Sequence, residues 1–431
     1  MQPLDPAWIG PPDSADAARA RLAAGLRHHG GPLSRSVASA FARVPRHIFV
    51  PEVGPAAAYR DEALVIKCGP DGLPVSSSSQ PAMMAIMLDQ LGLQRGDRVL
   101  EIGTGSGYNA AVMSEVTGPD GEVVSVDIDP ELVARARGSL ADAGYDRVLV
   151  LCADGGFGDP DRAPFDRIIV TAGAWDIAPA WLDQLVPGGL LVLPLSVRGI
   201  QLSVALRRDG GRWTGTSAWR CGFVKMLGTF AGPETVFQAS GPRALVGSMA
   251  DGAPADVGAI QAALAGPAVD ERVRIPVPGL ADLADLDLWV TIAAAGLDRI
   301  TVLAAPGGWF AMASLLPLGG LVSDATAPGQ LGLAVLAPAA VAQEQAARAG
   351  PGVLIRGFGP GGAELTAYLS GLVRDWFDAG RPGTQDLELA VWPASAPRPR
   401  QPPATSAGIV TRLRRPSVWI EAGWPAGESA G

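Results

Sequence analysis

Short apolar blocks alternate with amphipathic stretches between residues 98 and 194, which is the pattern of a parallel α/β sheet. The predicted strands are Arg98–Ile102, Glu122–Asp127, Val148–Cys152, Phe165–Val170 and Leu190–Pro194. The predicted helices are Tyr108–Val116, Pro130–Ala143 and Ala180–Leu185, and a turn at Pro187-Gly188-Gly189 precedes the last strand. Two further strands, Gln201–Arg207 and Thr216–Val224, flank Asp209-Gly210-Gly211 and predict a hairpin. We therefore expect one doubly wound, mostly parallel sheet that ends near Gly228.

Before this sheet, the chain also carries stretches with the composition and apolar spacing of helices. Helices are predicted at Asp16–Leu26 and at Ser34–Arg43, the second behind a serine cap. The Gly/Pro/Ser-rich stretch Gly69–Ser79 predicts a loop, followed by a helix at Ala82–Leu91. Pro81 suits a first helical turn, and Ser79 is placed to cap it.

The remainder of the chain, residues 229–431, predicts a separate α+β domain. Strands are predicted at Leu286–Ala293, Arg299–Leu303, Leu331–Leu336, Asp386–Trp392 and Ser417–Glu421. Helices are predicted at Pro338–Ala349 and Gly362–Ala379, and the Pro-rich stretch Arg398–Ala404 predicts an extended linker. Six tryptophans in this part are explained by core packing more simply than by peptide binding: Trp289, Trp309, Trp376, Trp392, Trp419 and Trp424.

Composition narrows the class of protein. The 431 residues carry a formal charge of −9, which argues against nucleic-acid partners. The chain shows neither a membrane-length apolar run nor a secretory leader, so we expect a cytoplasmic protein without a membrane partner. Three separated cysteines, Cys68, Cys152 and Cys221, predict neither disulfides nor a zinc site. The three histidines, His28, His29 and His47, all precede the sheet, which makes a histidine-led triad or metal cluster improbable.

The turn after the first strand of the sheet carries the most information about chemistry. Glycines stand at 103, 105 and 107, whereas the dinucleotide fingerprint would place its third glycine at 108, which is Tyr108. NAD and FAD are therefore disfavoured. Glu101 lies two residues before the turn, and Asp127 ends the next strand, where a carboxylate could accept both hydroxyls of a ribose. This arrangement favours S-adenosyl-L-methionine, which has no pyrophosphate to bind.

Ligands of open α/β sheets lie beyond the carboxyl ends of the strands, which places the candidate residues along one rim. Asp154 with Gly155 could bind the adenine amino group, although an N-cap role would also explain Asp154. Thr171 and the small residues after it would form the bottom of the pocket. The full candidate cofactor-binding set is Glu101, Gly103, Thr104, Gly105, Ser106, Gly107, Tyr108, Asn109, Asp127, Ile128, Asp154, Gly155 and Thr171, with no metal.

The serine run Ser76–Ser79 with Gln80-Pro81 is a second candidate, because hydroxyls and N–H groups at a helix N-terminus can bind a carboxylate. Here the chain resembles the protein-L-isoaspartate O-methyltransferases over residues 20–228. The segments that carry the resemblance, in the family's order, are Val44–Pro51, Ala58–Asp61, Ser79–Pro81, Val99–Ala111, Asp166–Ala172 and Gln184–Pro194.

The resemblance implies methyl transfer from S-adenosyl-L-methionine to an isoaspartyl or aspartyl carboxylate of a peptide or protein, followed by closure to a succinimide. It implies that Ser79 is the catalytic serine that bonds the acceptor carboxylate, with Ser78 and Gln80 beside it. Residues 1–80 would then be a helical cap with an acceptor loop, 81–228 the cofactor-binding core, and 229–431 a domain for peptide recognition.

Two departures keep alternatives open. Ser77-Ser78 replaces the family's Thr-Ile, and Phe223-Val224-Lys225-Met226 replaces its closing Phe-Val-Pro-Leu. The C-terminal domain, the serine-rich loop and Gly173-Ala174-Trp175-Asp176 also resemble a group that methylates one aspartate of a lanthipeptide or lasso-type precursor to install an aspartimide. A small-molecule methyltransferase and a non-enzymatic peptide-binding protein are the remaining hypotheses. The sequence does not decide between repair and dedicated modification, and it leaves the oligomeric state unknown.

Overall fold

A computed structural model describes residues 14–26, 33–70, 72–233, 235–241, 245–276, 279–304, 319–323, 331–338, 352–396 and 408–424. The chain divides into two compact units. Unit 1 comprises the described residues up to Leu195 together with Ser203–Ser217 and Cys221–Ala231. Unit 2 comprises Ser196–Leu202, Ala218–Arg220 and the described residues from Gly232 onward. Among the described residues, no helix is both long and apolar enough to cross a membrane.

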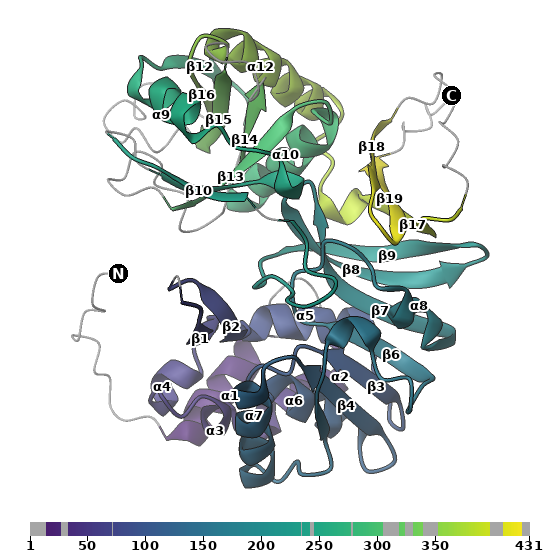
Figure 1. Ribbon diagram of the computed structural model, residues 1–431. Coiled ribbons are helices and arrows are strands. Elements are labelled where there is room, and N and C mark those ends of the chain that lie inside the picture. Colours follow the sequence, from purple (N-terminus) through teal and green to yellow (C-terminus); the bar gives the residue numbers. More distant parts are fainter. Residues whose placement is uncertain are drawn as a thin grey trace. The chain divides into compact units, whose positions relative to one another are not determined.

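Unit 1 is built on a sheet whose strands follow the order β9-β8-β7-β6-β3-β4-β5 (Figure 1). The strands are β3 (Arg98–Ile102), β4 (Glu122–Asp127), β5 (Leu149–Cys152), β6 (Phe165–Val170), β7 (Leu185–Val197), β8 (Ile200–Asp209) and β9 (Arg212–Cys221). Neighbours from β5 through β4, β3 and β6 to β7 are parallel. The predicted doubly wound α/β fold is therefore confirmed, and four of the five residues of the central strand β3 are buried, as parallel strands require.

The helices of unit 1 include five that precede the sheet in the chain and others that connect its strands. They are α1 (Ala15–Leu26), α2 (Arg35–Arg43), α3 (Arg46–Phe49), α4 (Pro55–Ala58), α5 (Pro81–Leu91), α6 (Tyr108–Thr117), α7 (Pro130–Asp142), η1 (Gly155–Phe157) and α8 (Pro179–Asp183). Ser34 caps α2 as predicted, because its hydroxyl accepts the N–H of Val37. One apolar cluster joins α1, α2, α5 and α6 to the sheet.

Two local predictions in unit 1 were wrong. The serine-rich stretch is no loop: β2 (Pro74–Ser78) pairs antiparallel with β1 (Leu64–Cys68). The Pro187-Gly188-Gly189 segment does not separate a strand from a helix but lies inside β7, where the pairing with β6 shifts from Leu185 to Leu190. The shift absorbs the extra residues as a bulge while the strand continues.

Unit 2 contains an antiparallel sheet in the order β10-β11-β13-β14-β15-β16-β12. Its strands are β10 (Thr235–Ala239), β11 (Leu245–Met249), β12 (Val269–Val273), β13 (Asp298–Ala304), β14 (Gly319–Ser323), β15 (Gly332–Pro338) and β16 (Val353–Phe358). Its helices are η2 (Ala250–Gly252), α9 (Val257–Ala265), α10 (Leu280–Ala293), α12 (Gly362–Asp378) and η4 (Thr384–Asp386). A smaller antiparallel group, β17 (Glu388–Pro393), β19 (Val418–Trp424) and β18 (Ile409–Arg414), completes the expected α+β content.

The predicted strand Leu286–Ala293 is wrong, because these residues form the second half of helix α10. The helix is buried along this run, Asp287 and Thr291 included, so burial on all sides leaves no apolar period that separates a buried helix from a strand. The predicted helix at 338–349, apart from Pro338 at the end of β15, lies outside the described residues, as do the linker 398–404, His28, His29 and Trp309. Trp289, Trp376 and Trp424 are buried and donate their indole N–H groups to backbone carbonyls, as core packing predicts.

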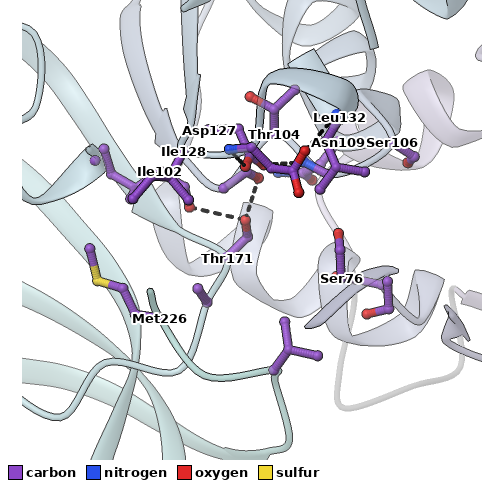
Figure 2. Close-up of a pocket in the computed structure, with 18 of the residues that line it drawn as sticks. Ser76, Ile102, Thr104, Ser106, Asn109, Asp127, Ile128, Leu132, Thr171 and Met226 are labelled. Atoms are coloured by element: carbon purple, nitrogen blue, oxygen red, sulfur yellow. Dashed lines mark hydrogen bonds between the residues drawn. The ribbon is translucent and has the colours of Figure 1, made fainter. Parts of the chain in front are cut away.

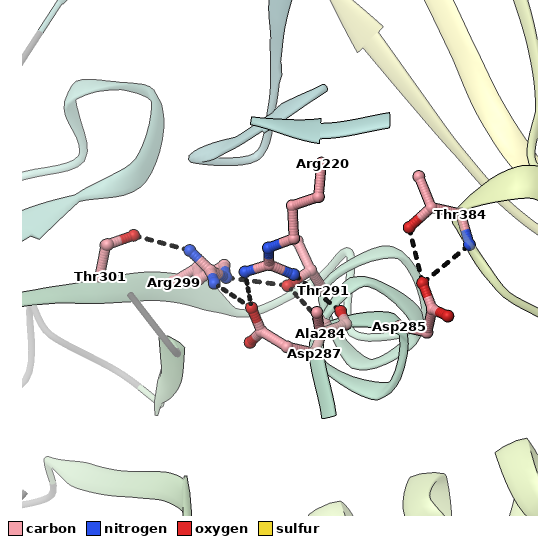
Figure 3. A network of polar contacts seen from close by, with 8 residues as sticks. All are labelled: Arg220, Ala284, Asp285, Asp287, Thr291, Arg299, Thr301 and Thr384. Carbon is pink, nitrogen blue, oxygen red and sulfur yellow. Dashed lines mark hydrogen bonds and ion pairs between the residues drawn. The ribbon is translucent and has the colours of Figure 1, made fainter. Parts of the chain in front are cut away.

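A buried ionic network stabilises unit 2 (Figure 3). One carboxylate oxygen of Asp287 accepts from Arg220 at 2.6 Å and from Arg299 at 2.8 Å. Arg299 also donates to the hydroxyls of Thr291 and Thr301. Since both Asp287 and Arg299 are almost fully buried, each charge needs the other to compensate for the water it has lost.

Candidate active site

A pocket opens at the carboxyl ends of β3, β4, β5 and β6 in unit 1 (Figure 2). The strand order reverses here, because β4 and β6 lie on opposite sides of β3, and such switch points are where α/β sheets bind ligands. The pocket spans about 900 Å³, part of it open to solvent. Its lining includes most of the predicted residues: Ser78, Ser79, Gly103, Thr104, Gly105, Ser106, Tyr108, Asn109, Asp127, Ile128, Gly155 and Thr171.

The glycine turn between β3 and α6 needs glycine for steric reasons. Gly103 has φ +103, and a Cβ there would lie 2.6 Å from the Thr171 hydroxyl oxygen. Gly105 has φ +51, and its Cβ would lie 3.4 Å from the carbonyl oxygen of Ser77. The Thr171 hydroxyl donates to the Gly103 carbonyl at 2.7 Å, which fixes the turn against β6. The backbone of this turn therefore lies directly beside the serine strand β2.

Asp127 ends β4 at the rim of the pocket. One of its carboxylate oxygens accepts the N–H of Gly105 at 2.9 Å, and the other accepts the N–H of Asp129 at 3.0 Å. Asp129, which also lines the pocket, caps α7 and is bonded by Lys67 Nζ at 2.6 Å. Lys67 is a cause of the lowered pKa of Asp129 even though burial opposes that shift. Both carboxylates are thus held in fixed orientations.

Glu101 does not line the pocket. It is completely buried beneath the glycine turn, where it accepts from Asn109 Nδ2 at 2.7 Å and from the Ser125 hydroxyl at 2.5 Å. Desolvation raises the pKa of Glu101 to about 7. Its side chain orients Asn109, which lines the pocket and whose Oδ1 is buried without a hydrogen-bond partner in the described structure. We therefore assign Glu101 a supporting position under the turn.

Three other predicted residues also lie outside the lining. Gly107 caps α6, where a Cβ would press on Ala136 at 3.3 Å. Asp154 caps η1, and its oxygens accept the N–H groups of Gly156 and Thr229, so the N-cap explanation is the one that the structure supports. Gln80 points to Asp61, to which it donates at 3.0 Å.

The serine strand contributes polar groups from the opposite side of the pocket. Ser76, Ser77, Ser78 and Ser79 all line it. The Ser78 hydroxyl is buried and has no hydrogen-bond partner in the described structure. Ser79 does not cap α5 as predicted: Gln80 is the N-cap residue, and the carboxylate of Asp61 accepts the N–H of Ala82 at 2.8 Å. The hydroxyl of Ser79 therefore has no capping role.

Arg46 holds this strand in place, a role that sequence reasoning missed. Its buried guanidinium donates to the carbonyls of Ser78 at 3.3 Å and Ser79 at 3.0 Å. It also donates to three carbonyls at and after the end of α4, those of Ala58, Arg60 and Glu62, at 2.9 to 3.0 Å. The guanidinium lies 5.7 Å from the ring centroid of Tyr108, at the start of α6. Arg46 thus ties the serine strand to the helix that follows the glycine turn.

The pocket suits S-adenosyl-L-methionine. Asp127 stands at a strand end, the glycines admit close approach, and Asn109 offers a buried acceptor without a partner. Ile102, Ile128 and Leu132 supply apolar walls of the kind that a purine ring requires. Among the described residues, no group of histidine, cysteine, aspartate or glutamate side chains could hold a metal ion.

Comparisons with known proteins show which family this chain belongs to. The model of the family "Protein-L-isoaspartate(D-aspartate) O-methyltransferase (PCMT)" matches residues 17–230. The protein-L-isoaspartate O-methyltransferase of Methanopyrus kandleri is 43% identical over 222 residues, which are 51% of this chain and 96% of the relative. That of Hyperthermus butylicus is 41% identical over 226 residues, 50% of this chain and 91% of the relative. A solved structure of a protein-L-isoaspartate O-methyltransferase is 22% identical, with a TM-score of 0.47 and coverage of 86% of this chain and 96% of that one. The chain belongs to the protein-L-isoaspartate O-methyltransferase family of S-adenosyl-L-methionine-dependent enzymes, and the predicted family and cofactor are confirmed.

Proposed function

We propose that this protein methylates an isoaspartyl or aspartyl carboxylate of a peptide or protein in the pocket between the glycine turn and strand β2. The observation that supports this most is the close approach of the serine strand to the turn, where the Ser77 carbonyl lies 3.4 Å from the Cβ position of Gly105. An acceptor bound by the serines would reach the cofactor without a large movement of either segment. Ser79 is proposed as the acceptor-binding serine, with the unpartnered hydroxyl of Ser78 beside it.

The cofactor, when bound, supplies an electrophilic methyl group on a sulfonium. A peptide carboxylate is already ionised at neutral pH, because its ordinary pKa lies near 4, so the reaction needs no general base. A carboxylate oxygen forms a bond to the methyl carbon while the carbon–sulfur bond breaks and its electron pair stays on sulfur. The contribution of the protein is alignment of the two reactants and exclusion of water, which lower the barrier by several kcal/mol or more.

The methyl ester then reacts within the peptide. The following backbone nitrogen attacks the ester carbonyl and loses its proton, methanol leaves, and a succinimide remains. This step breaks and forms bonds in the peptide alone. It follows from the ester that the site produces and requires no further residue.

The test compares the full chain with Ser79→Ala. Ester formation on an isoaspartyl peptide is followed by mass spectrometry, and binding of S-adenosylhomocysteine is followed by calorimetry. We expect the substitution to lower kcat/KM for the peptide by about tenfold or more, since it removes a hydrogen bond to a charged group. The affinity for S-adenosylhomocysteine should stay within about twofold, because Ser79 is proposed to bond the acceptor carboxylate and not the cofactor. Equal turnover by both proteins would refute the assignment of Ser79.

Dedicated modification of one aspartate in a precursor peptide is the second candidate. Unit 2 favours it, because this unit has its own apolar core around Phe237, Ile260 and Phe358, and its part from Gly232 onward lies outside the matched family region. The chemistry at the pocket would be the same. A chain that esterifies neither an isoaspartyl nor an aspartyl model peptide, yet binds S-adenosylhomocysteine, would support this candidate over repair.

A further inference from the structure

Segment Val224–Leu227 forms one wall of the pocket, and its first three residues belong to the stretch Phe223–Met226 that replaces the resembled family's Phe-Val-Pro-Leu. Its backbone is fixed on both sides of Gly173, which follows β6: Gly173 donates to the Val224 carbonyl at 2.8 Å, and Met226 donates to the Gly173 carbonyl at 3.1 Å. Met226 is buried, whereas Lys225 and Leu227 are exposed. Lys225 therefore occupies a defined position on the pocket wall while its side chain still reaches solvent.

Lys225 supplies the positive charge of this pocket. All the lining residues belong to the described part of the chain, and Lys225 is the one basic residue among them. The acidic ones are Asp127 and Asp129, and their oxygens are engaged by backbone N–H groups and, for Asp129, by Lys67. A negatively charged ligand group that enters the pocket would therefore meet a cation at one wall only.

The chemistry restricts what that cation is useful for. Methyl transfer neutralises the negative charge of the acceptor carboxylate and the positive charge of the sulfonium. A lysine bound to the reacting carboxylate would stabilise the reactants more than the transition state and would slow the reaction. A second carboxylate, which keeps its charge throughout, gains the same attraction without that penalty.

We propose that Lys225 is a specificity-determining residue that selects acceptor peptides with a second acidic side chain next to the reacting carboxylate. The proposal rests on the proposed function and names the class of peptide that the pocket accepts. Proline at this position, as in the resembled family, could not supply such a charge. Since the lysine is exposed, its effect is that of a partly solvated ion pair, about threefold to tenfold in kcat/KM, and it should weaken as salt is added.

The kinetic test uses three isoaspartyl peptides that differ only in a neighbouring residue, which is Glu, Gln or Lys. The wild-type chain should prefer the Glu peptide through a lower KM. Lys225→Met should remove the preference, and Lys225→Glu should reverse it toward the Lys peptide. Arg208→Glu, at an exposed position of β8, changes the net charge as much as Lys225→Glu does, and it should keep the wild-type order of preference among the three peptides.

The outcomes separate the two proposals. If the wild-type chain esterifies none of the peptides, the proposed function fails for general isoaspartyl acceptors. If it esterifies the Glu and Gln peptides equally and Lys225→Glu changes nothing, the role of Lys225 is refuted while the proposed function stands.

A binding measurement independent of turnover is available because the chain has two lysines, Lys67 and Lys225. Carbon-13-labelled lysine would give two side-chain resonances, which Lys225→Arg assigns. With S-adenosylhomocysteine present, the Glu peptide should shift the Lys225 resonance, whereas the Gln peptide should shift it less at equal saturation. Equal shifts with both peptides would overturn the proposal.

Discussion

Arg46 offers the sharpest test of how the acceptor strand is positioned. Its guanidinium donates five hydrogen bonds to backbone carbonyls, and two of them, to Ala58 and Ser78, are buried. Arg46→Met leaves those two carbonyl oxygens without a donor at about 1–3 kcal/mol each, or about 2–6 kcal/mol together. Burial also lowers the pKa of Arg46, because the desolvated cation is unfavourable. Removing that cation offsets part of the free energy lost with the hydrogen bonds. We expect a net destabilisation of about 3 kcal/mol, concentrated where the carbonyls lie.

The assay is hydrogen–deuterium exchange read by mass spectrometry, combined with peptide kinetics. In Arg46→Met the amides of residues 74–79 should exchange faster, and KM for the peptide should rise by about tenfold, a shift of about 1.4 kcal/mol. Arg43→Met is the matched control, because Arg43 is 67% exposed and pairs with Glu115 at the surface. If residues 74–79 of Arg46→Met exchange at the wild-type rate and KM is unchanged, Arg46 does not hold strand β2 in place.

Three further predictions concern other parts of the chain. Because burial raises the pKa of Glu101 from 4.5 to about 7, the folded state holds a proton that the unfolded state releases, so the free energy of unfolding should fall as pH rises from about 4.5 to 7. Glu101→Gln should flatten that dependence in urea titrations at a series of pH values, and an equal slope in both proteins would contradict the burial argument. Gly105→Ala places a side chain at φ +51, at a cost of about 1–2 kcal/mol, and should weaken binding of S-adenosylhomocysteine about tenfold in calorimetry; an unchanged Kd would contradict it. Asp287→Ala removes the carboxylate shared by the buried Arg299 and the partly buried Arg220 and should destabilise unit 2 by about 3–5 kcal/mol in denaturant titrations followed by tryptophan fluorescence, whereas a loss below about 1 kcal/mol would show that the network is solvated.

The sheet of unit 1 could be predicted because its signals are local. Strands β3, β4 and β6 have the predicted bounds, since each is a short apolar block that ends at a glycine or a polar residue. The glycine turn follows β3 as expected, and its spacing together with the flanking acids Glu101 and Asp127 indicated the cofactor class. Periodicity and turn chemistry are properties of neighbouring residues, so a sequence displays them directly.

The errors arose where distant residues decide the structure. A serine run has weak strand propensity, and β2 exists because β1 pairs with it. Asp61 caps α5 from 21 residues away, which displaced the predicted cap at Ser79. The buried contacts of Arg46 join the chain around positions 58–62 to the strand that ends near 79, and no local pattern reveals them. Glu101, an acid beside a glycine turn, was predicted to bind the cofactor, and its position on a central strand buries it beneath the turn.

The proposed function requires that the pocket bring a sulfonium methyl group to a peptide carboxylate. The most direct measurement gives the purified full chain S-adenosyl-L-methionine with a deuterium-labelled methyl group and an equal mixture of matched isoaspartyl and aspartyl peptides, and locates the label by mass spectrometry. We predict a labelled methyl ester on the carboxylate of one of these peptides and loss of the label as that ester closes to a succinimide. An unlabelled peptide mixture, from a chain shown by calorimetry to bind S-adenosylhomocysteine, would contradict the account for general peptide acceptors.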